Sequence, residues 1–229
     1  MKYLIVNADD FGASHGINRG IMEAHRSGIL TSTSLLVNTA WSREAAELSR
    51  AAPELSVGLH ADLRGALKEP SADRGRRLPD ELEKQFSRFE ELMGRPPTHL
   101  DSHHNLHRDP SALPVFLELA ARHGLPLREH SAVRYFSKFY GQWGGQTHFE
   151  QISVESLTRM LETEIEEGIT ELSCHPGYVE ASYPTGYGVE REAELRALCD
   201  ASIREVLAAR SIQLISYQER GIILLSAPR

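Results

Sequence analysis

Acidic and imidazole side chains stand where three predicted strands end. The apolar run Leu4–Val6 leads into Asp9 and Asp10, and two later apolar runs end at His60 and His103. Because the carboxyl ends of parallel strands meet at one end of a barrel, these side chains are expected to lie together. Two imidazoles and one carboxylate form a three-ligand site with open positions, which hydrolytic metal chemistry needs. We therefore predict that Asp10, His60 and His103 bind a divalent metal ion.

The adjacent carboxylates of Asp9 and Asp10 pose a geometric condition. In a continuing strand neighbouring side chains point to opposite faces, so only one of the two would face the site. Both can face one centre if the strand ends there and the backbone turns, which Phe11-Gly12 permits. We expect this arrangement, with the alternative that Asp9 only hydrogen-bonds amides of the following loop.

Two further residues are candidates for acid, binding or positioning roles. His175 ends an apolar segment and is followed by Pro176-Gly177, which forces a turn. Histidine titrates near neutrality and suits protonation of a leaving group, although a histidine packed at a strand edge gives the same pattern. Arg128 lies in a short strand-like fragment, where it could hold a carboxylate in place or bind substrate.

Histidines are concentrated between positions 99 and 107. On an extended strand His99, Asp101 and His103 share one face, and His103 lies nearest the end where a barrel places its site. We predict that the substrate is contacted by Arg128 and by three more residues: His104, His107 and Tyr178.

Strand-like and helix-like segments alternate along the chain. The predicted strands cover residues 3–7, 31–37, 55–60, 98–103, 126–128, 170–175 and 212–216. The predicted helices cover residues 17–25, 42–51 with Ser42 as N-cap, 80–93, 112–123, 153–167 and 189–209. Alternation of this kind indicates parallel strands joined by right-handed crossovers. We predict one α/β domain over residues 1–229, an irregular or incomplete TIM-type barrel with about seven mostly parallel strands.

One long segment, residues 131–149, is rich in Gly, Phe, Tyr and Trp and shows no clear period. A loop of that length is usually functional or interfacial. We expect it to shape the opening of the substrate site or to contact a second copy of the chain in a homodimer. A role as a surface for another partner is the alternative.

Composition narrows the class of protein. The 229 residues carry a net charge of −7, which argues against a mainly electrostatic nucleic-acid binder. Two cysteines, Cys174 and Cys199, form no disulfide framework. The N-terminus lacks a signal-peptide pattern, and no apolar run approaches the length of about 18–20 residues that spans a bilayer. We expect a cytoplasmic protein without a transmembrane segment.

Taken together, these motifs resemble the YdjC family of carbohydrate deacetylases, which includes the ChbG and HpnK types. The resemblance rests on Asn7–Gly12, Thr31–Thr33, Gly58–His60, Thr98–His104 and His175–Gly177, in this order across nearly the whole chain. The stretch Phe136–Trp143 is more similar to the hopanoid-associated HpnK branch. Many members carry a third consecutive histidine where this chain has Asn105, so a substrate contact at that position does not carry over.

The resemblance implies a mechanism and assigns roles to residues. Asp10, His60 and His103 would hold one divalent metal, with zinc or magnesium as first choices and nickel, cobalt or iron as alternatives. By analogy, Asp9 would be the base and His175 the acid. The implied reaction removes an acetyl group from an N-acetylated sugar or glycolipid, such as an N-acetylglucosamine oligosaccharide or a glycosyl hopanoid, and releases acetate.

Two other functions are compatible with the same motifs. Two histidines and one carboxylate also bind iron in oxygenases, whose activity requires oxygen. A non-catalytic sugar-binding protein could keep a degenerate site. The presence of both Asp9 and His175 argues against the binding protein, since a binder has no need for an acid/base pair.

Overall fold

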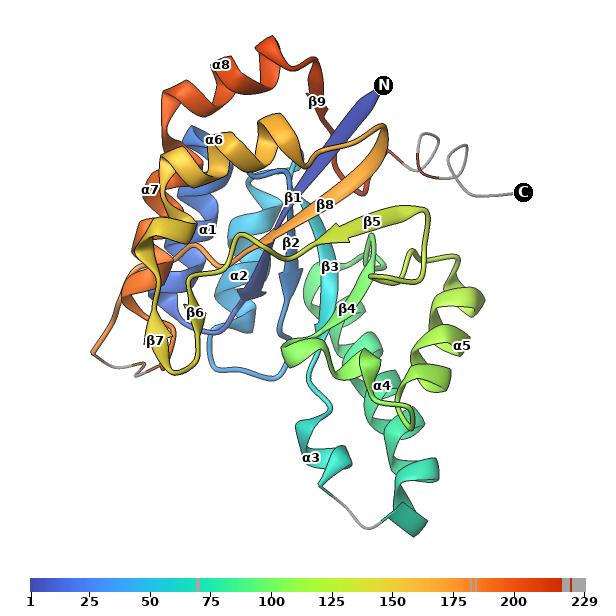
Figure 1. Ribbon diagram of the computed structural model, residues 1–229. Helices are drawn as coiled ribbons and strands as arrows, with labels where there is room; N and C mark the ends of the chain where they lie inside the picture. The colour runs from blue at the N-terminus through green and yellow to red at the C-terminus, as the bar shows by residue number, and fades with distance from the viewer. Residues whose placement is uncertain (69–70, 182, 184, 220–222, 224–229) are drawn as a thin grey trace.

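Parallel strands form a curved sheet at the centre of the molecule, and helices pack outside it (Figure 1). The computed structural model describes residues 1–68, 71–181, 183, 185–219 and 223. Within these residues the sheet contains seven strands: β1 (Lys2–Phe11), β2 (Ser32–Leu35), β3 (Ser56–Ala61), β4 (Leu100–Ser102), β5 (Val133–Phe136), β8 (Gly168–Cys174) and β9 (Ile212–Leu214).

The strand order is β4-β3-β2-β1-β8-β5, and β9 pairs with the first residues of β1. Every pairing in this sheet is parallel. The two edge strands of this order are β4 and β5. Beyond β4 the described chain adds only a single bridge, between Leu100 and Leu127, so the barrel is incomplete. The predicted fold, an incomplete barrel of about seven parallel strands, is confirmed.

Helices connect the strands and cover the outside of the sheet. They are α1 (His15–Ser27), α2 (Ser42–Arg50), α3 (Arg64–Leu67), α4 (Ser71–Met93), α5 (Leu113–His123), α6 (Val154–Thr163), α7 (Val189–Cys199) and α8 (Ala201–Ala209), with 3₁₀ segments at His103–Arg108 and Phe149–Ile152. Local signals set some boundaries: Ser14 Oγ caps α1 by accepting from the Ile17 amide at 3.1 Å, and Gly124 ends α5 at φ 62°. In the described part of the chain, no helix combines the length and apolar character that crossing a membrane requires.

The predicted helix 189–209 and the predicted strand 126–128 differ from the structure. The helix predicted over 189–209 is two helices, because Asp200 is extended and its carboxylate accepts from the Ser202 amide at 2.9 Å, which starts a new helix. The strand predicted at 126–128 is reduced to the bridge at Leu127.

Other differences concern the segment 131–149 and the start of α2. The segment contains β5 and a small antiparallel hairpin of β6 (Gln142–Trp143) and β7 (Gln146–Thr147). Ser42 is the first residue of α2 rather than its N-cap, and its hydroxyl donates to the Leu36 carbonyl at 2.6 Å. The N-cap prediction for Ser42 was wrong because a serine hydroxyl can hydrogen-bond to a loop carbonyl as readily as to the amides at a helix start.

β1 carries one extra residue relative to β2 near its carboxyl end. Ala8 and Phe11 pair with Thr33 and Leu35, so three steps along β1 match two along β2. Asp10 lies within this bulge and has a left-handed φ of 69°, a conformation that aspartate adopts more readily than most residues. The turn expected after the strand therefore begins at Asp10 itself, and the bulge lets both adjacent carboxylates face one cavity.

Candidate active site and metal centre

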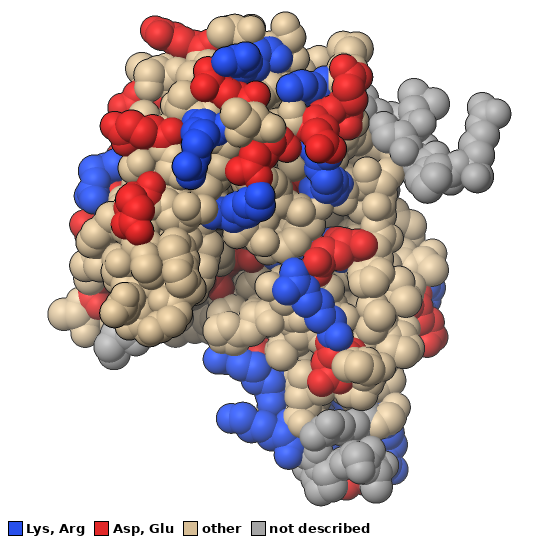
Figure 2. Space-filling model, in the orientation of Figure 1, with Lys and Arg blue, Asp and Glu red and all other residues tan. Residues whose placement is uncertain are grey.

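A cavity of about 660 Å³ opens at the carboxyl ends of the central strands, and the hollow is visible near the middle of Figure 2. Five residues predicted from the sequence line it together: Asp9, Asp10, His60, His103 and His175. They come from the ends of β1, β3, β4 and β8, the end where a parallel barrel places its chemistry.

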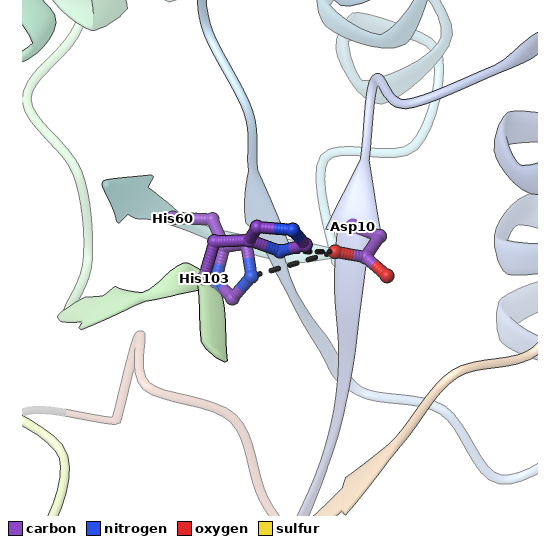
Figure 3. Close-up of side chains that lie close together, drawn as sticks. All are labelled: Asp10, His60 and His103. Atoms are coloured by element: carbon purple, nitrogen blue, oxygen red, sulfur yellow. Dashed lines mark ion pairs between the residues drawn. The ribbon is translucent and has the colours of Figure 1, made fainter. Parts of the chain in front are cut away.

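Asp10, His60 and His103 converge on one point (Figure 3). Asp10 Oδ1 lies 3.0 Å from His103 Nδ1 and 3.5 Å from His60 Nε2. Two ligand atoms at tetrahedral positions around a zinc ion, each about 2.0–2.1 Å from it, are roughly 3.3 Å apart. Asp10 Oδ1 is buried and accepts no well-formed hydrogen bond among the described residues, so it remains free to coordinate. The three donors therefore fit a divalent cation.

The remaining polar atoms of two of these ligands are occupied. Arg191 donates to Asp10 Oδ2 at 2.5 Å, which leaves Oδ1 for the cation. Asp101 Oδ1 lies 2.7 Å from His60 Nδ1, which orients the ring so that Nε2 faces Asp10. A carboxylate behind a ligating histidine in this way fixes the ring and raises its basicity as a ligand.

Arg128 holds several carboxylates at the base of the site. Its guanidinium donates to both oxygens of Asp9 at 2.7 and 2.8 Å, to Glu171 at 2.6 and 3.0 Å, and lies 2.8 Å from Asp101. Of the two roles that the sequence left open for Arg128, the structure supports the positioning of a carboxylate. Asp9 and Asp101 also lie near His60, but Arg128 already engages both, so the Asp10 cluster is the better cation site.

The charges of this buried region favour a bound cation. Burial acts to raise the pKa values of Asp9, Asp10 and Asp101, but neighbouring arginine and imidazole groups lower them, so all three are ionised. These three buried carboxylates outnumber the two buried guanidiniums that pair with them. Burial likewise opposes a charge on His60, yet Asp101 and Asp9 raise its pKa to about 10. A positive charge at the imidazole position is therefore stabilised by its surroundings.

His175 stands beside Asp9, with its Nε2 atom 3.9 Å from Asp9 Oδ2. Behind it, the Glu194 carboxylate accepts the backbone amide of His175, and its Oε1 lies 4.0 Å from the ring Nδ1. Tyr140 and Tyr187 stack on each other at 4.6 Å, and each meets the imidazole edge-on at 5.6 Å. These contacts hold the ring so that Nε2 faces the cavity.

Two pKa shifts distinguish His175 from its neighbour Glu194. Burial lowers the pKa of His175 to about 4, although Asp9 and Asp10 act in the opposite direction. Burial raises the pKa of Glu194 to about 8, although Tyr187 and the His175 amide stabilise its anion. At neutral pH the imidazole is therefore uncharged and Glu194 is mostly protonated. Displaced titrations of this kind are common at catalytic sites.

The family model described as YdjC-like protein matches residues 3–209. The chain belongs to the YdjC-like family.

Two relatives of this YdjC-like chain carry functional names. A carbohydrate deacetylase from Geobacillus stearothermophilus is 36% identical over 253 residues and covers 95% of this chain and 98% of its own length. A chitooligosaccharide deacetylase from Escherichia fergusonii is 36% identical over 247 residues and covers 94% of this chain and 98% of its own length.

A solved structure shares the architecture of this YdjC-like chain over nearly all its length. It is the crystal structure of a protein from Enterococcus faecalis V583, with 28% identity and a TM-score of 0.82. The match covers 96% of this chain and 98% of that one. The agreement supports the incomplete barrel described above.

The structure brings only one of the four predicted substrate contacts, His104, to the cavity. His104 lines the cavity at a left-handed φ of 54°, and Asn105 follows it in the same conformation. His107 is buried, with Nδ1 at 2.7 Å from Ser102 Oγ and Nε2 toward Glu129, and it does not line the cavity. The left-handed residues His104 and Asn105 turn the chain so that His107 points into the protein, away from the cavity.

Arg128 and Tyr178 also lie outside the cavity lining. Arg128 is only 3% exposed and its hydrogen bonds go to carboxylates. The Tyr178 hydroxyl donates to Glu23, and its ring packs against Arg19. The structure therefore does not bring Arg128 and Tyr178 to the cavity surface beside the predicted metal ligands.

Sequence reasoning missed several residues of the site. Arg191 and Glu194 lie one turn apart on α7 and are both buried, which no local pattern in a charged helix reveals. Tyr183 and Tyr187 line the cavity from a stretch that has no regular period. The aromatic content of 131–149 was the one available signal, because Tyr135, Phe139 and Tyr140 from that segment line the cavity.

Proposed function

We propose that this YdjC-like chain is a metal-dependent hydrolase that removes the acetyl group from an N-acetylated amino sugar in an oligosaccharide or glycoconjugate. The observation that carries the proposal is the placement of Asp9 and His175, 3.9 Å apart, beside the cluster of Asp10, His60 and His103. A base, an acid and a cation site in one cavity are the parts that amide hydrolysis needs. The names of the two 36% identical relatives support the same substrate class.

Asp10, His60 and His103 would hold the cation. When bound, it would supply a Lewis acid that polarises the acetamide carbonyl and lowers the pKa of water. Imidazole ligands favour zinc, cobalt, nickel or iron, whereas magnesium prefers oxygen ligands, so we place zinc first and keep magnesium as the alternative. Asp101 and Arg191 keep two of the ligands in position.

Asp9 is suited to take the proton from the attacking water. Its carboxylate is ionised, and bidentate hydrogen bonds from Arg128 and one from Asn7 Nδ2 at 3.0 Å fix its direction. A carboxylate with a lowered pKa is a weak base, so it can act only on water that is already acidified. This requirement matches a site that includes a Lewis acid.

His175 is suited to deliver a proton to the departing amine. It is uncharged in the free site, so it donates only after it has taken up a proton during the reaction. The proton that Asp9 accepts is available across the 3.9 Å between Asp9 Oδ2 and His175 Nε2. The amine leaves with this proton, and acetate remains as the second product.

The cavity wall suits a sugar ring better than an extended lipid. Tyr140, Tyr183 and Tyr187 line the cavity beside polar groups, a combination typical of sites that orient small polar ligands. An oligosaccharide containing N-acetylglucosamine is therefore the first substrate choice. A glycosyl hopanoid, suggested by the resemblance of 136–143, is the alternative.

The test is acetate release from three substrates: N-acetylglucosamine, its β-linked disaccharide and an N-acetylglucosaminyl hopanoid. Each is incubated with the protein as purified, after chelator treatment, and after zinc or magnesium is restored. We expect chelator-sensitive acetate release that the preferred metal restores, highest with the disaccharide. No acetate from any substrate with verified metal content would contradict the proposal.

The same assay separates the two other functions. An iron oxygenase would lose activity when oxygen is removed, whereas hydrolysis continues under nitrogen. A sugar-binding protein would bind the disaccharide in calorimetry without releasing acetate. Size measurement at micromolar concentration tests the proposed homodimer separately.

A further inference from the structure

A second hollow of about 370 Å³ lies next to the metal-binding cavity. Three residues line both spaces: Arg64, His103 and Tyr183. The predicted metal ligand His103 therefore stands at the junction of the two hollows. A ligand whose reacting group reaches His103 from the larger cavity can extend directly into the smaller one.

The wall of the second hollow is the loop 36–41 between β2 and α2. This loop is held firmly to the end of β1. Thr39 Oγ1 donates to the Gly12 carbonyl, the Leu36 amide donates to the Phe11 carbonyl at 2.8 Å, and Ser42 Oγ accepts from the Thr39 amide at 3.0 Å. A loop fixed in this way presents its side chains without an ordering cost on binding.

Trp41 is the large side chain of this wall, and 40% of its surface is exposed. Its ring is supported from one side by His15, with centroids 5.5 Å apart. His15 is held in turn by Glu44 at 2.6 Å, and Glu44 accepts from Asn18 at 2.7 Å. An exposed indole supported by a buttressed imidazole adds little to the core and leaves part of its ring available to a ligand.

The chemistry of the hollow matches a pyranose ring. Trp41 provides apolar surface with the mostly buried Leu36 and Val37 beside it, while the ion pair of Arg64 and Asp62 provides polar groups. A sugar ring has an apolar face of C–H groups and an equatorial edge of hydroxyls, so it can stack on the indole while its edge meets the polar rim.

We propose that the second hollow is a sugar subsite in which Trp41 stacks against the ring adjacent to the N-acetylated one. The subsite rests on the proposed deacetylase function, because that function places the N-acetyl group beside His103. It makes the enzyme selective for oligosaccharides of two or more rings over the monosaccharide.

The test compares Trp41→Ala with wild type on N-acetylglucosamine and on its β-linked disaccharide. We expect kcat/KM for the disaccharide to fall by about 5- to 10-fold, mainly through KM, with the monosaccharide affected less than about twofold. Trp41→Phe should retain most of the disaccharide activity. The matched control is Trp143→Ala, because Trp143 is 49% exposed, stacks on His148 and lines neither hollow.

Direct binding keeps the subsite testable if no acetate is released. Calorimetry with the disaccharide uses Asp9→Asn as the background, alone and combined with Trp41→Ala or Trp143→Ala. Weaker binding only with Trp41→Ala would support the subsite even where deacetylation fails. Two results would overturn the subsite. One is an equal loss of kcat/KM on the monosaccharide and the disaccharide in Trp41→Ala, and the other is an unchanged affinity of that variant for the disaccharide.

Discussion

His60 and Asp101 form a buried pair, with His60 Nδ1 2.7 Å from Asp101 Oδ1. The two residues face each other across neighbouring parallel strands, in register in β3 and β4. The pairing fixes which imidazole nitrogen of His60 points at Asp10. The proposed role of His60 therefore depends on Asp101, which would not touch the cation.

Asp101→Asn should therefore weaken metal binding without removing a ligand. We expect a loss of about 10- to 100-fold in affinity, because the neutral amide supports the imidazole less strongly. Titration of the chelated protein with zinc measures the effect. Asp200→Asn is the control, since Asn caps a helix as well as Asp does at that exposed position. Unchanged affinity in Asp101→Asn would refute the positioning role.

Asp9→Asn and His103→Ala should separate catalysis from metal binding. Asp9→Asn keeps the three ligands, so it should retain the metal while acetate release falls by about 100-fold or more. His103→Ala should lose both. Metal content by elemental analysis and acetate release are measured on the same preparations. An active, metal-free His103→Ala protein would contradict the ligand assignment.

Arg128→Met should lower stability sharply. Removing one partner of a buried ionic cluster leaves its carboxylates uncompensated, at a cost of about 3–5 kcal/mol. Urea unfolding monitored by circular dichroism measures the change. Arg122→Met is the control, because Arg122 forms surface ion pairs with Glu83 and Glu118 that are worth about 1 kcal/mol or less. Similar losses in both variants would argue against the cluster.

The clustering of Asp10, His60 and His103 could be predicted from the sequence because each lies at or just beyond the end of a strand, which apolar runs mark well. Asp10 was assigned correctly as sharing a cavity with Asp9, although the bulge that allows this has no sequence signature apart from the following glycine. β5 was missed because its VRYF pattern leaves Arg134 and Tyr135 only partly buried.

Residues that act through long-range pairing were beyond sequence reasoning. Arg191 reaches Asp10 from the opposite end of the chain, and Glu194 reaches His175 from the next helix. His107 lies close to His103 in sequence but is turned away from the cavity by two left-handed residues, His104 and Asn105. Proximity along the chain does not predict the direction of a side chain there, because a single turn changes it.

Glu194→Gln should change how stability depends on pH. The pKa of Glu194 is about 8 in the folded protein, above its ordinary value of 4.5, so its neutral form is favoured by folding. This contribution is fully present below about pH 4.5 and is lost as pH rises through 8. Relative to the variant, wild type should lose on the order of 2–4 kcal/mol between pH 5 and 9.

The effect is measured as the unfolding free energies of wild type and Glu194→Gln across this pH range. His175→Asn provides a comparison in which stability should change with pH in the opposite direction. The pKa of His175 is lowered to about 4, so wild type should lose stability relative to that variant as pH falls from 6.5 to 4. A pH-independent difference between wild type and Glu194→Gln would show that Glu194 is not neutral in the folded state.

The three predicted ligands belong to three different segments: β1, β3 and the turn after β4. No fragment that lacks one of these strands can assemble the centre, so metal binding would report that the sheet has formed from β4 to β1. Binding only to the folded chain also adds to its stability, by about 2.7 kcal/mol when free metal reaches 100 times its dissociation constant. Metal supply during synthesis would then govern how much of the protein reaches its native state, in addition to how much of it is active.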